Sequence, residues 1–275
     1  MTTLQVHRDG AIACLTVDRP RQANAIDNAT LEQLVAAYEK FDADREVSLV
    51  VLRGAGKGFS SGHDLGSGGD ILASLASGDV ISDWHRLDAA NRLLLRLWDG
   101  SLPILAAVHG FCLGAAVELV MMCDFAIAAE DARFAQPALR GTGGAPTELI
   151  HPFVMGLRRA KQYLWLSQEL SGREAADWGL VNLAVPADQL DDTVAAWAGR
   201  IAAMPNDNIR LMRRAMHRLV DANGFRQALS AGVEIDAIAH ASGKTREWLA
   251  KIDAVGLKQA VAERDLPFAN GVAPK

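Results

Sequence analysis

The sequence has few cysteines, no long apolar run and no signal-like start, and each absence excludes a class of protein. Its three cysteines, Cys14, Cys112 and Cys123, are an odd number without CxxC spacing, which argues against a disulfide framework or a zinc site. The longest apolar stretch, Ile104–Asp124, is interrupted by glycines, a histidine and a glutamate, so it does not make the roughly 18–20 residues of a membrane span. The first residues are polar and unlike a signal peptide. We therefore expect a cytoplasmic protein with core thiols and no membrane span.

The sequence also lacks an excess of basic residues. Its 275 residues carry a net charge of −5, and Lys and Arg are scattered rather than gathered into a stripe, which argues against a nucleic-acid partner. Half of the residues are apolar and 22% are charged, as in ordinary globular proteins. Such a chain is long enough for one large domain or two small ones.

The first 130 residues alternate strands, loops and helices. Apolar patterns on both sides of Asp9-Gly10 predict a hairpin of residues 4–7 and 12–17. Asn28 is expected to cap a helix that runs to about Asp42. Further strands are predicted over 47–53, 104–108 and 125–129, and further helices over 82–99 and 113–122. This order favours an α/β sheet with crossover helices.

The remainder of the chain is mainly helical. Ser171 and Glu174 form a capping box, residues 181–185 predict a last strand, and 187–264 have helical periodicity. We therefore expect a core over residues 1–200 and a helical region over 201–275. Segments 201–220 and 225–241 supply more apolar helix surface than the core needs, which suits packing between subunits.

A glycine-rich loop, residues 54–69, raises the first candidate for chemistry. Gly58–Gly62 matches the G-x-S-x-G pattern of serine hydrolases, which needs a strand directly before the serine and a helix directly after it. Glycines flank Ser60 on both sides instead, so a nucleophilic Ser60 is the minor interpretation. The alternatives are a loop shaped by its glycines, or one whose backbone N–H groups point at a ligand.

Glu118 is the second candidate, because it lies in a run of small and apolar residues from Phe111 to Cys123. The small residues around Ala115 begin a helix, whose first N–H groups are unpaired. If the Ala115 N–H converged with one from loop residues 61–65, the pair would form an oxyanion hole. Glu118, one turn further along, would then lie where acid/base chemistry next to a polarised carbonyl is required. The alternative is a structural carboxylate held by backbone donors.

Four segments, in order along the chain, together resemble the crotonase, or enoyl-CoA hydratase/isomerase, superfamily. They are Arg19-Pro20 with Asn24-Ala25, GFSSGHDL, AAVHGFCLGAAVELVMMCDFAIAAEDARF and GLKQAVAERDLPF. The resemblance implies a crotonase-like spiral of repeated ββα units with a C-terminal helical trimerisation region. It also implies a homotrimer or a dimer of trimers, an acyl-CoA substrate that carries the coenzyme A itself, and no metal or redox cofactor.

The resemblance also implies roles for individual residues. The backbone N–H groups of His63 and Ala115 would bind the thioester oxygen, and Glu118 would be the acid/base. The residues implied to lie along the substrate are Arg21, Ala23, Ala25, Ser61, Gly62, Asp64, Leu65, Gly114 and Ala138.

The chain departs from the hydratases of this superfamily at Ala138. Those enzymes carry a second glutamate directly after a proline, whereas this chain reads Gln136-Pro137-Ala138, and alanine cannot move a proton. Glu148 and His151 are the nearby candidates to replace that acid.

Hydration of a 2-enoyl-CoA is the leading expectation. Double-bond isomerisation, hydrolysis of a β-dicarbonyl thioester, and CoA-ester binding with little activity remain alternatives. Trp84, Trp98 and Trp165 belong either to a bulky acyl pocket or to the core.

Overall fold

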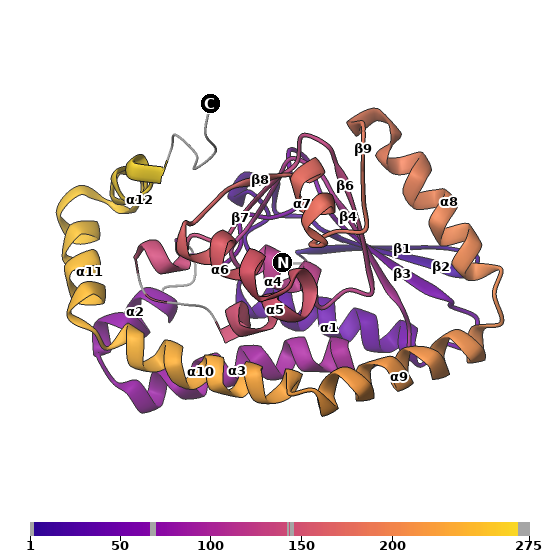
Figure 1. Ribbon diagram of the computed structural model, residues 1–275, viewed down its shortest axis with the longest axis horizontal. Helices are drawn as coiled ribbons and strands as arrows, with labels where there is room; N and C mark the ends of the chain where they lie inside the picture. Colours follow the sequence, from indigo (N-terminus) through magenta and orange to yellow (C-terminus); the bar gives the residue numbers. More distant parts are fainter. Residues whose placement is uncertain (1–2, 67–69, 142, 144–145, 269–275) are drawn as a thin grey trace.

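The computed structural model describes residues 3–66, 70–141, 143 and 146–268; the last residues of the glycine-rich loop, 67–69, lie outside this range. Two sheets organise the fold (Figure 1). The larger has the order β1-β2-β3-β4-β6-β9, with β1 antiparallel to β2 and the other pairs parallel. Its strands are β1 Leu4–Asp9, β2 Ile12–Val17, β3 Leu49–Gly54, β4 Ile104–Val108, β6 Phe125–Ala129 and β9 Leu183–Val185.

The inner strands are apolar along almost their whole length. Every residue of β4 is buried, and β3 has one residue, Arg53, that is partly exposed. A continuous apolar run is expected where helices cover both faces of a parallel sheet. The helix α8 (Leu190–Ala202) packs on β3, β4 and β6, and α1 (Asn28–Asp42) packs on β2 and on α3 (Val80–Asp99). The core of the protein lies between these layers.

The smaller sheet gives the chain its ββα repeat. It contains β5 (Phe111–Leu113), β7 (Arg133–Ala135) and β8 (Leu170–Ser171) in that order. The strands β4 and β5 lie in different sheets and are followed by α4 (Ala115–Met121), and β6 and β7 repeat this alternation. The predicted spiral of ββα units is therefore confirmed.

The C-terminal part is helical, as predicted. Its two longest helices, α9 (Asn206–Ala222) and α10 (Phe225–His240), follow one another, and α10 packs along α3 (Figure 1). The chain ends in α11 (Gly243–Val255) and α12 (Leu257–Asp265), which pack on each other. The boundary expected at residue 200 falls within α8. No helix in the described part of the chain is long and apolar enough to cross a membrane.

The remaining helices are short and connect these layers. They are α2 (Asp70–Ser77), α5 (His151–Met155), α6 (Leu157–Trp165) and α7 (Gly172–Trp178), with 3₁₀ turns η1 (Pro20–Gln22), η2 (Ala138–Arg140) and η3 (Pro146–Ile150) near the site.

Local sequence signals located most of the longer elements, and the structure corrects the expectations for α1, α4 and α2. The cap of α1 is Asp27 rather than Asn28, because the Asp27 carboxylate accepts the Thr30 N–H at 2.7 Å. The helix expected from Leu113 begins at Ala115, since the preceding residues form β5. The helix α2 was not predicted at all. It packs against α3 and α11, so contacts distant in sequence support it.

Candidate active site

The loop that follows β3 lies against the start of α4. The Ser60 N–H donates to the Phe111 carbonyl oxygen at 3.1 Å, and the Leu113 N–H donates to the Ser60 carbonyl oxygen at 3.0 Å. On the other side of the loop, the Ile26 N–H donates to the Gly62 carbonyl oxygen at 2.7 Å. Backbone hydrogen bonds on both sides therefore fix the position of the loop.

Gly62 allows the closest approach between this loop and α4. Its φ of +87° is one that residues with side chains rarely adopt. A Cβ at this position would lie 2.4 Å from the Leu113 carbonyl oxygen and 3.0 Å from the Ala115 nitrogen. Only glycine therefore fits between the loop and the first residue of the helix.

We expect Gly62→Ala to lower the free energy of unfolding by about 2–4 kcal/mol, because the new methyl group combines a left-handed backbone with a steric clash. Denaturant unfolding measures the change. Gly66→Ala is the matched control, since its Cβ would meet nothing closer than the Asp64 carboxylate at 3.8 Å. Equal stabilities of the two variants would contradict the tight packing at Gly62.

Two unpaired N–H groups meet at this contact. Ala115 is the first residue of α4, where a helix has no internal acceptor for its N–H. His63 follows Gly62 directly, and its neighbours in the loop make the bonds to Ile26. In the described part of the chain, neither the His63 nor the Ala115 N–H has an acceptor, and both residues line the same cavities. The pair has the character of an oxyanion hole.

Glu118 projects into this site from the next turn of α4. Its side chain is 3% exposed, and the Gln136 amide donates to one carboxylate oxygen at 3.4 Å. Burial raises the pKa of Glu118 to about 7, while the polar side chains of Thr147 and Gln136 beside it oppose a further rise. Near neutral pH the carboxyl group can therefore both accept and donate a proton.

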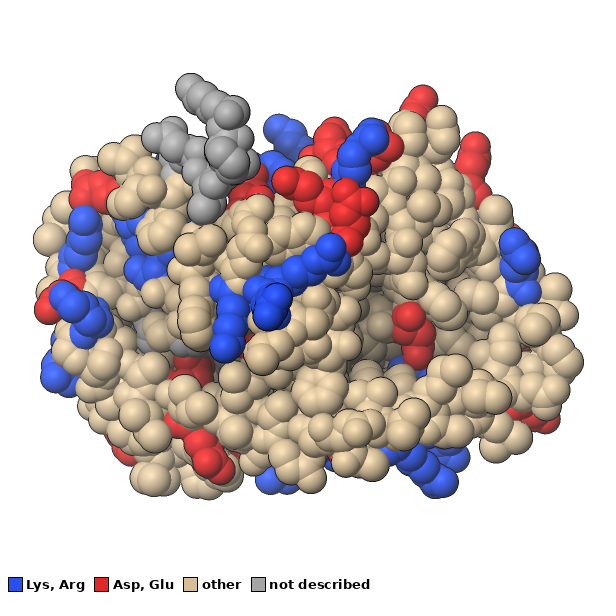
Figure 2. Space-filling model, viewed as in Figure 1, with Lys and Arg blue, Asp and Glu red and all other residues tan. Residues whose placement is uncertain are grey.

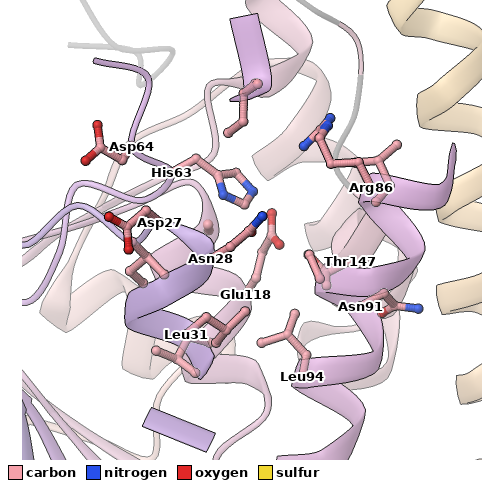
Figure 3. A pocket seen from close by; sticks show the side chains of 16 residues that line it. Asp27, Asn28, Leu31, His63, Asp64, Arg86, Asn91, Leu94, Glu118 and Thr147 are labelled. Carbon is pink, nitrogen blue, oxygen red and sulfur yellow. The ribbon is translucent and has the colours of Figure 1, made fainter. Parts of the chain in front are cut away.

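The His63 side chain also stands in the cavity, opposite α3 (Figure 3). Enclosure by the surrounding protein, with the charges of Arg86 and His240, lowers the pKa of His63 to about 4. The imidazole is therefore neutral near pH 7.

Two adjoining cavities meet at these residues. The smaller, about 70 Å³, is shown in Figure 3, where His63, Glu118 and Arg86 project into it from the loop, α4 and α3. The larger, about 360 Å³, extends beneath the C-terminal helices. The C-terminal residues that line it are Asp236, His240, Trp248, Val261, Arg264 and Asp265. An apolar ligand chain would therefore contact both halves of the protein.

Of the residues expected along the substrate, six either line one of these cavities or adjoin it. Ser61, Leu65, Gly114 and Ala138 line the larger cavity, Asp64 lines the smaller one, and Gly62 lies between His63 and Ser61. The Asp64 carboxylate also forms an ion pair with Arg19 at 2.8 Å.

The other three lie beside the loop rather than in the cavities. Arg21 is exposed on η1, Ala25 is buried, and the Ala23 carbonyl oxygen accepts the Ser61 N–H at 3.0 Å. This segment therefore runs along the outer side of the site.

Ser60 does not have the geometry of a hydrolase nucleophile. Its hydroxyl is buried and accepts the Gly62 N–H at 3.1 Å. The strand β3 ends at Gly54 and the next helix begins at Asp70, so the serine is not at a strand-to-helix turn.

The two candidates for the missing acid lie away from the cavities. Glu148 and His151 are buried on η3 and α5, and neither lines either cavity. The His151 Nδ1 contacts the Glu148 carbonyl oxygen at 3.1 Å. Burial lowers the pKa of His151 to about 4.

The three tryptophans considered for an acyl pocket, Trp84, Trp98 and Trp165, line neither cavity. Trp98 stacks on His217 and Phe225 at the junction of α3 with the C-terminal helices, and Trp84 packs beside Leu87. Trp165 is 68% exposed. The core interpretation therefore holds for Trp98.

The sequence pattern did not indicate that two polar residues, Asp236 and His240, belong to the site. Asp236 and His240 lie one turn apart on α10 and are both buried. The sequence does carry a signal for this pair. Segment 225–241, which we expected only to pack between subunits, has an acid and a histidine at i, i+4 spacing. What the sequence does not show is that α10 packs along α3 and brings both to the site.

Comparisons with known proteins agree on one family. The enoyl-CoA hydratase/isomerase family model matches residues 7–247. Mycobacterium tuberculosis EchA13, provisionally named an enoyl-CoA hydratase, is 34% identical over 249 residues, covering 85% of this chain and 78% of that protein. The short-chain-enoyl-CoA hydratase of Clostridium acetobutylicum is 31% identical, covering 78% and 80%. An enoyl-CoA hydratase structure from Mycobacterium smegmatis matches with a TM-score of 0.91 at 26% identity, covering 98% and 96%. The chain therefore belongs to the enoyl-CoA hydratase/isomerase family and has the fold of the crotonase superfamily.

Proposed function

We propose that the protein adds water across the double bond of a 2-enoyl-CoA to give a 3-hydroxyacyl-CoA. The observation that carries this proposal is a pair of N–H groups, from His63 and Ala115, that have no acceptor among the described residues and lie beside the buried carboxyl group of Glu118. The relatives named as enoyl-CoA hydratases support the same reaction.

The two N–H groups would bind the thioester carbonyl oxygen. Attack of water at C3 moves electrons onto that oxygen and forms an enolate, so donors already fixed in place stabilise the transition state more than the substrate. The Gly62 contact keeps these donors together. Only the backbone of His63 takes part in this step.

Glu118 would activate the water. Its ionised form accepts a proton as the water oxygen bonds to C3, and a pKa of about 7 leaves that form available near neutral pH. Neither this step nor the enolate requires a metal or redox cofactor. The segment with Arg21, Ala23 and Ala25 would contact the coenzyme A moiety, with the exposed Arg21 near a phosphate.

Incubation of the purified protein with crotonyl-CoA, a longer 2-enoyl-CoA and a 3-enoyl-CoA tests this function. Hydration removes the conjugated thioester absorbance of a 2-enoyl-CoA. Appearance of that absorbance from the 3-enoyl-CoA would instead demonstrate isomerisation. Binding of these esters without any change in absorbance would overturn the proposal.

The proposed assembly is a homotrimer, alone or paired. Four large apolar side chains on α9 are more than half exposed: Leu211, Met212, Met216 and Leu219. The surface over α9 is mostly tan, the colour of uncharged residues, in Figure 2. A row of exposed apolar side chains of this kind is typical of a subunit interface.

We expect the double variant Leu211→Glu/Met216→Glu to remain folded and to dissociate, because both side chains are exposed in the single chain. Light scattering would then report about one 29.4 kDa chain per particle. Arg218→Ala, an exposed position on the same helix, is the control. An unchanged particle mass in the double variant would exclude this surface as the interface.

The proposed location is the cytoplasm. Cys14, Cys112 and Cys123 are all free thiols, as is usual in a reducing compartment.

A further inference from the structure

A second carboxyl group faces the cavity that contains Glu118. Asp236 is 3% exposed, and its Oδ1 has no hydrogen-bond partner among the described residues. It lines the larger cavity together with Glu118 and Ala138, the residue at the position of the missing acid. A buried carboxyl oxygen without a hydrogen bond lowers stability, so its presence calls for an explanation such as a catalytic role.

A chain of polar side chains connects Asp236 to α3. The His240 Nδ1 lies 2.6 Å from Asp83 Oδ2, and the His240 Nε2 lies 3.4 Å from Asp236 Oδ1. The Asp83 carboxylate also accepts from Ser74 Oγ at 2.8 Å and from Arg86 Nη2 at 2.7 Å. Burial acts to raise the pKa of Asp83, but the hydrogen bonds from His240, Ser74 and Arg86 outweigh it and hold that pKa well below its usual range.

The members of this chain lie in different electrostatic surroundings. The His240 ring lies between two carboxyl groups, with Nδ1 facing the ionised Asp83 and Nε2 facing Asp236. Asp236 is in the opposite situation to Asp83. Burial, with the nearby carboxyl groups of Glu118, Glu148 and Asp83, raises its pKa to about 9, against the opposing charge of Arg86. Asp236 is therefore a carboxylic acid near neutral pH.

We propose that Asp236 is the second acid/base residue of the site, where its carboxyl group donates the proton that the substrate receives at C2. This inference rests on the hydratase function proposed above. The carboxyl group of Asp236 on α10 supplies the proton that Ala138 on η2 cannot supply, and both residues line the same cavity.

The proton balance of the reaction closes with these two groups. The water oxygen bonds to C3 and passes one proton to the Glu118 carboxylate, while the electrons of the double bond move onto the thioester to form the enolate. The enolate then forms a C2–H bond with the proton of Asp236. Glu118 is left protonated and Asp236 ionised. A proton moves from Glu118, with a pKa of about 7, to Asp236, with a pKa of about 9, and restores the starting state.

Asp236→Asn tests the proposal, because it keeps the size of the side chain and removes the proton that can be transferred. We expect kcat to fall at least about 100-fold with KM within about threefold of the wild type. We also expect slower exchange of the C2 protons of butyryl-CoA in D₂O, followed by NMR. Glu234→Gln, an exposed acid on the same helix, is the matched control and should change neither rate.

The pH dependence of kcat gives an independent measurement. The wild-type rate should fall above about pH 9 as Asp236 ionises, and the residual activity of Asp236→Asn should lack this decline. The titratable and charged groups around Asp236 are Glu118, Glu148, Asp83, Arg86, His63, His240, Arg264 and Asp265. Because Glu118 is coupled to Asp236, the profile reports the pair.

The possible outcomes separate this inference from the function on which it rests. If Asp236→Asn retains kcat within about threefold while Glu118→Gln is inactive, the hydratase function stands and Asp236 is structural. If the wild type hydrates no 2-enoyl-CoA but exchanges C2 protons through Asp236, the hydratase function is wrong and the role of Asp236 stands. A wild type that neither hydrates nor exchanges overturns both.

Discussion

Glu118→Gln is expected to lower kcat by a factor of about 10³ or more and to leave substrate binding nearly unchanged. Glutamine keeps the shape of the side chain and can still contact Gln136, but it cannot accept a proton from water. Hydration of crotonyl-CoA, measured by the loss of absorbance, gives kcat and KM separately. In the wild type we expect the rate to fall as the pH drops below about 7, because the protonated form of Glu118 is not a base.

The same substitution should stabilise the protein. The pKa of Glu118 is 4.5 when unburied and about 7 in the fold, so the folded state holds a proton that the unfolded chain releases between these values. The wild type therefore loses up to about 3 kcal/mol of stability as the pH rises from 4.5 to 7, and the variant avoids this loss. Denaturant unfolding at pH 5 and pH 8 measures the difference.

Glu148→Gln is the matched control, because Glu148 is also a buried acid but lines neither cavity. It should retain turnover within a few-fold of the wild type. Loss of activity in Glu148→Gln with retention in Glu118→Gln would reverse the assignment of the base.

Arg213→Ala is expected to lower the free energy of unfolding by about 3–5 kcal/mol, because it leaves a buried carboxylate unpaired. Arg213 is 5% exposed on α9, and its Nε donates to both oxygens of Asp124 at 2.8 Å. Its other nitrogens donate to the carbonyl oxygens of Leu97, Trp98 and Gly100. This guanidinium therefore joins α9 to the end of α3 and to the sheet.

Chemical denaturation of the two variants Arg213→Ala and Arg218→Ala measures this effect. Arg218 is exposed on the same helix, so its removal should change stability by less than about 0.5 kcal/mol. A loss below about 1 kcal/mol for Arg213→Ala would mean that the C-terminal helices are held mainly by apolar packing.

Elements with strong local signals could be predicted from the sequence. The predicted strands over 104–108 and 125–129 coincide with β4 and β6, and the capping box of Ser171 and Glu174 begins α7. The short strands β5, β7 and β8 were missed, because two or three residues carry too little pattern to be distinguished from a turn.

The residues of the site likewise differ in how far the sequence could predict them. Ala115 and Glu118 lie one turn apart, so their relation follows from helix geometry, and the family resemblance supplied His63. Asp236 joins them only because α10 packs along α3, a contact between segments more than 100 residues apart that periodicity cannot reveal.

The cavity has an evolutionary consequence, because its wall comes from two separate parts of the chain. The amides that would hold the thioester belong to the first half, whereas Trp248, Val261 and Arg264 form the wall beneath α11 and α12. Substitutions in these last two helices can reshape the space for the acyl group without disturbing the Gly62 contact. Substrate range can therefore diverge between descendants of one ancestor while the chemistry is inherited unchanged.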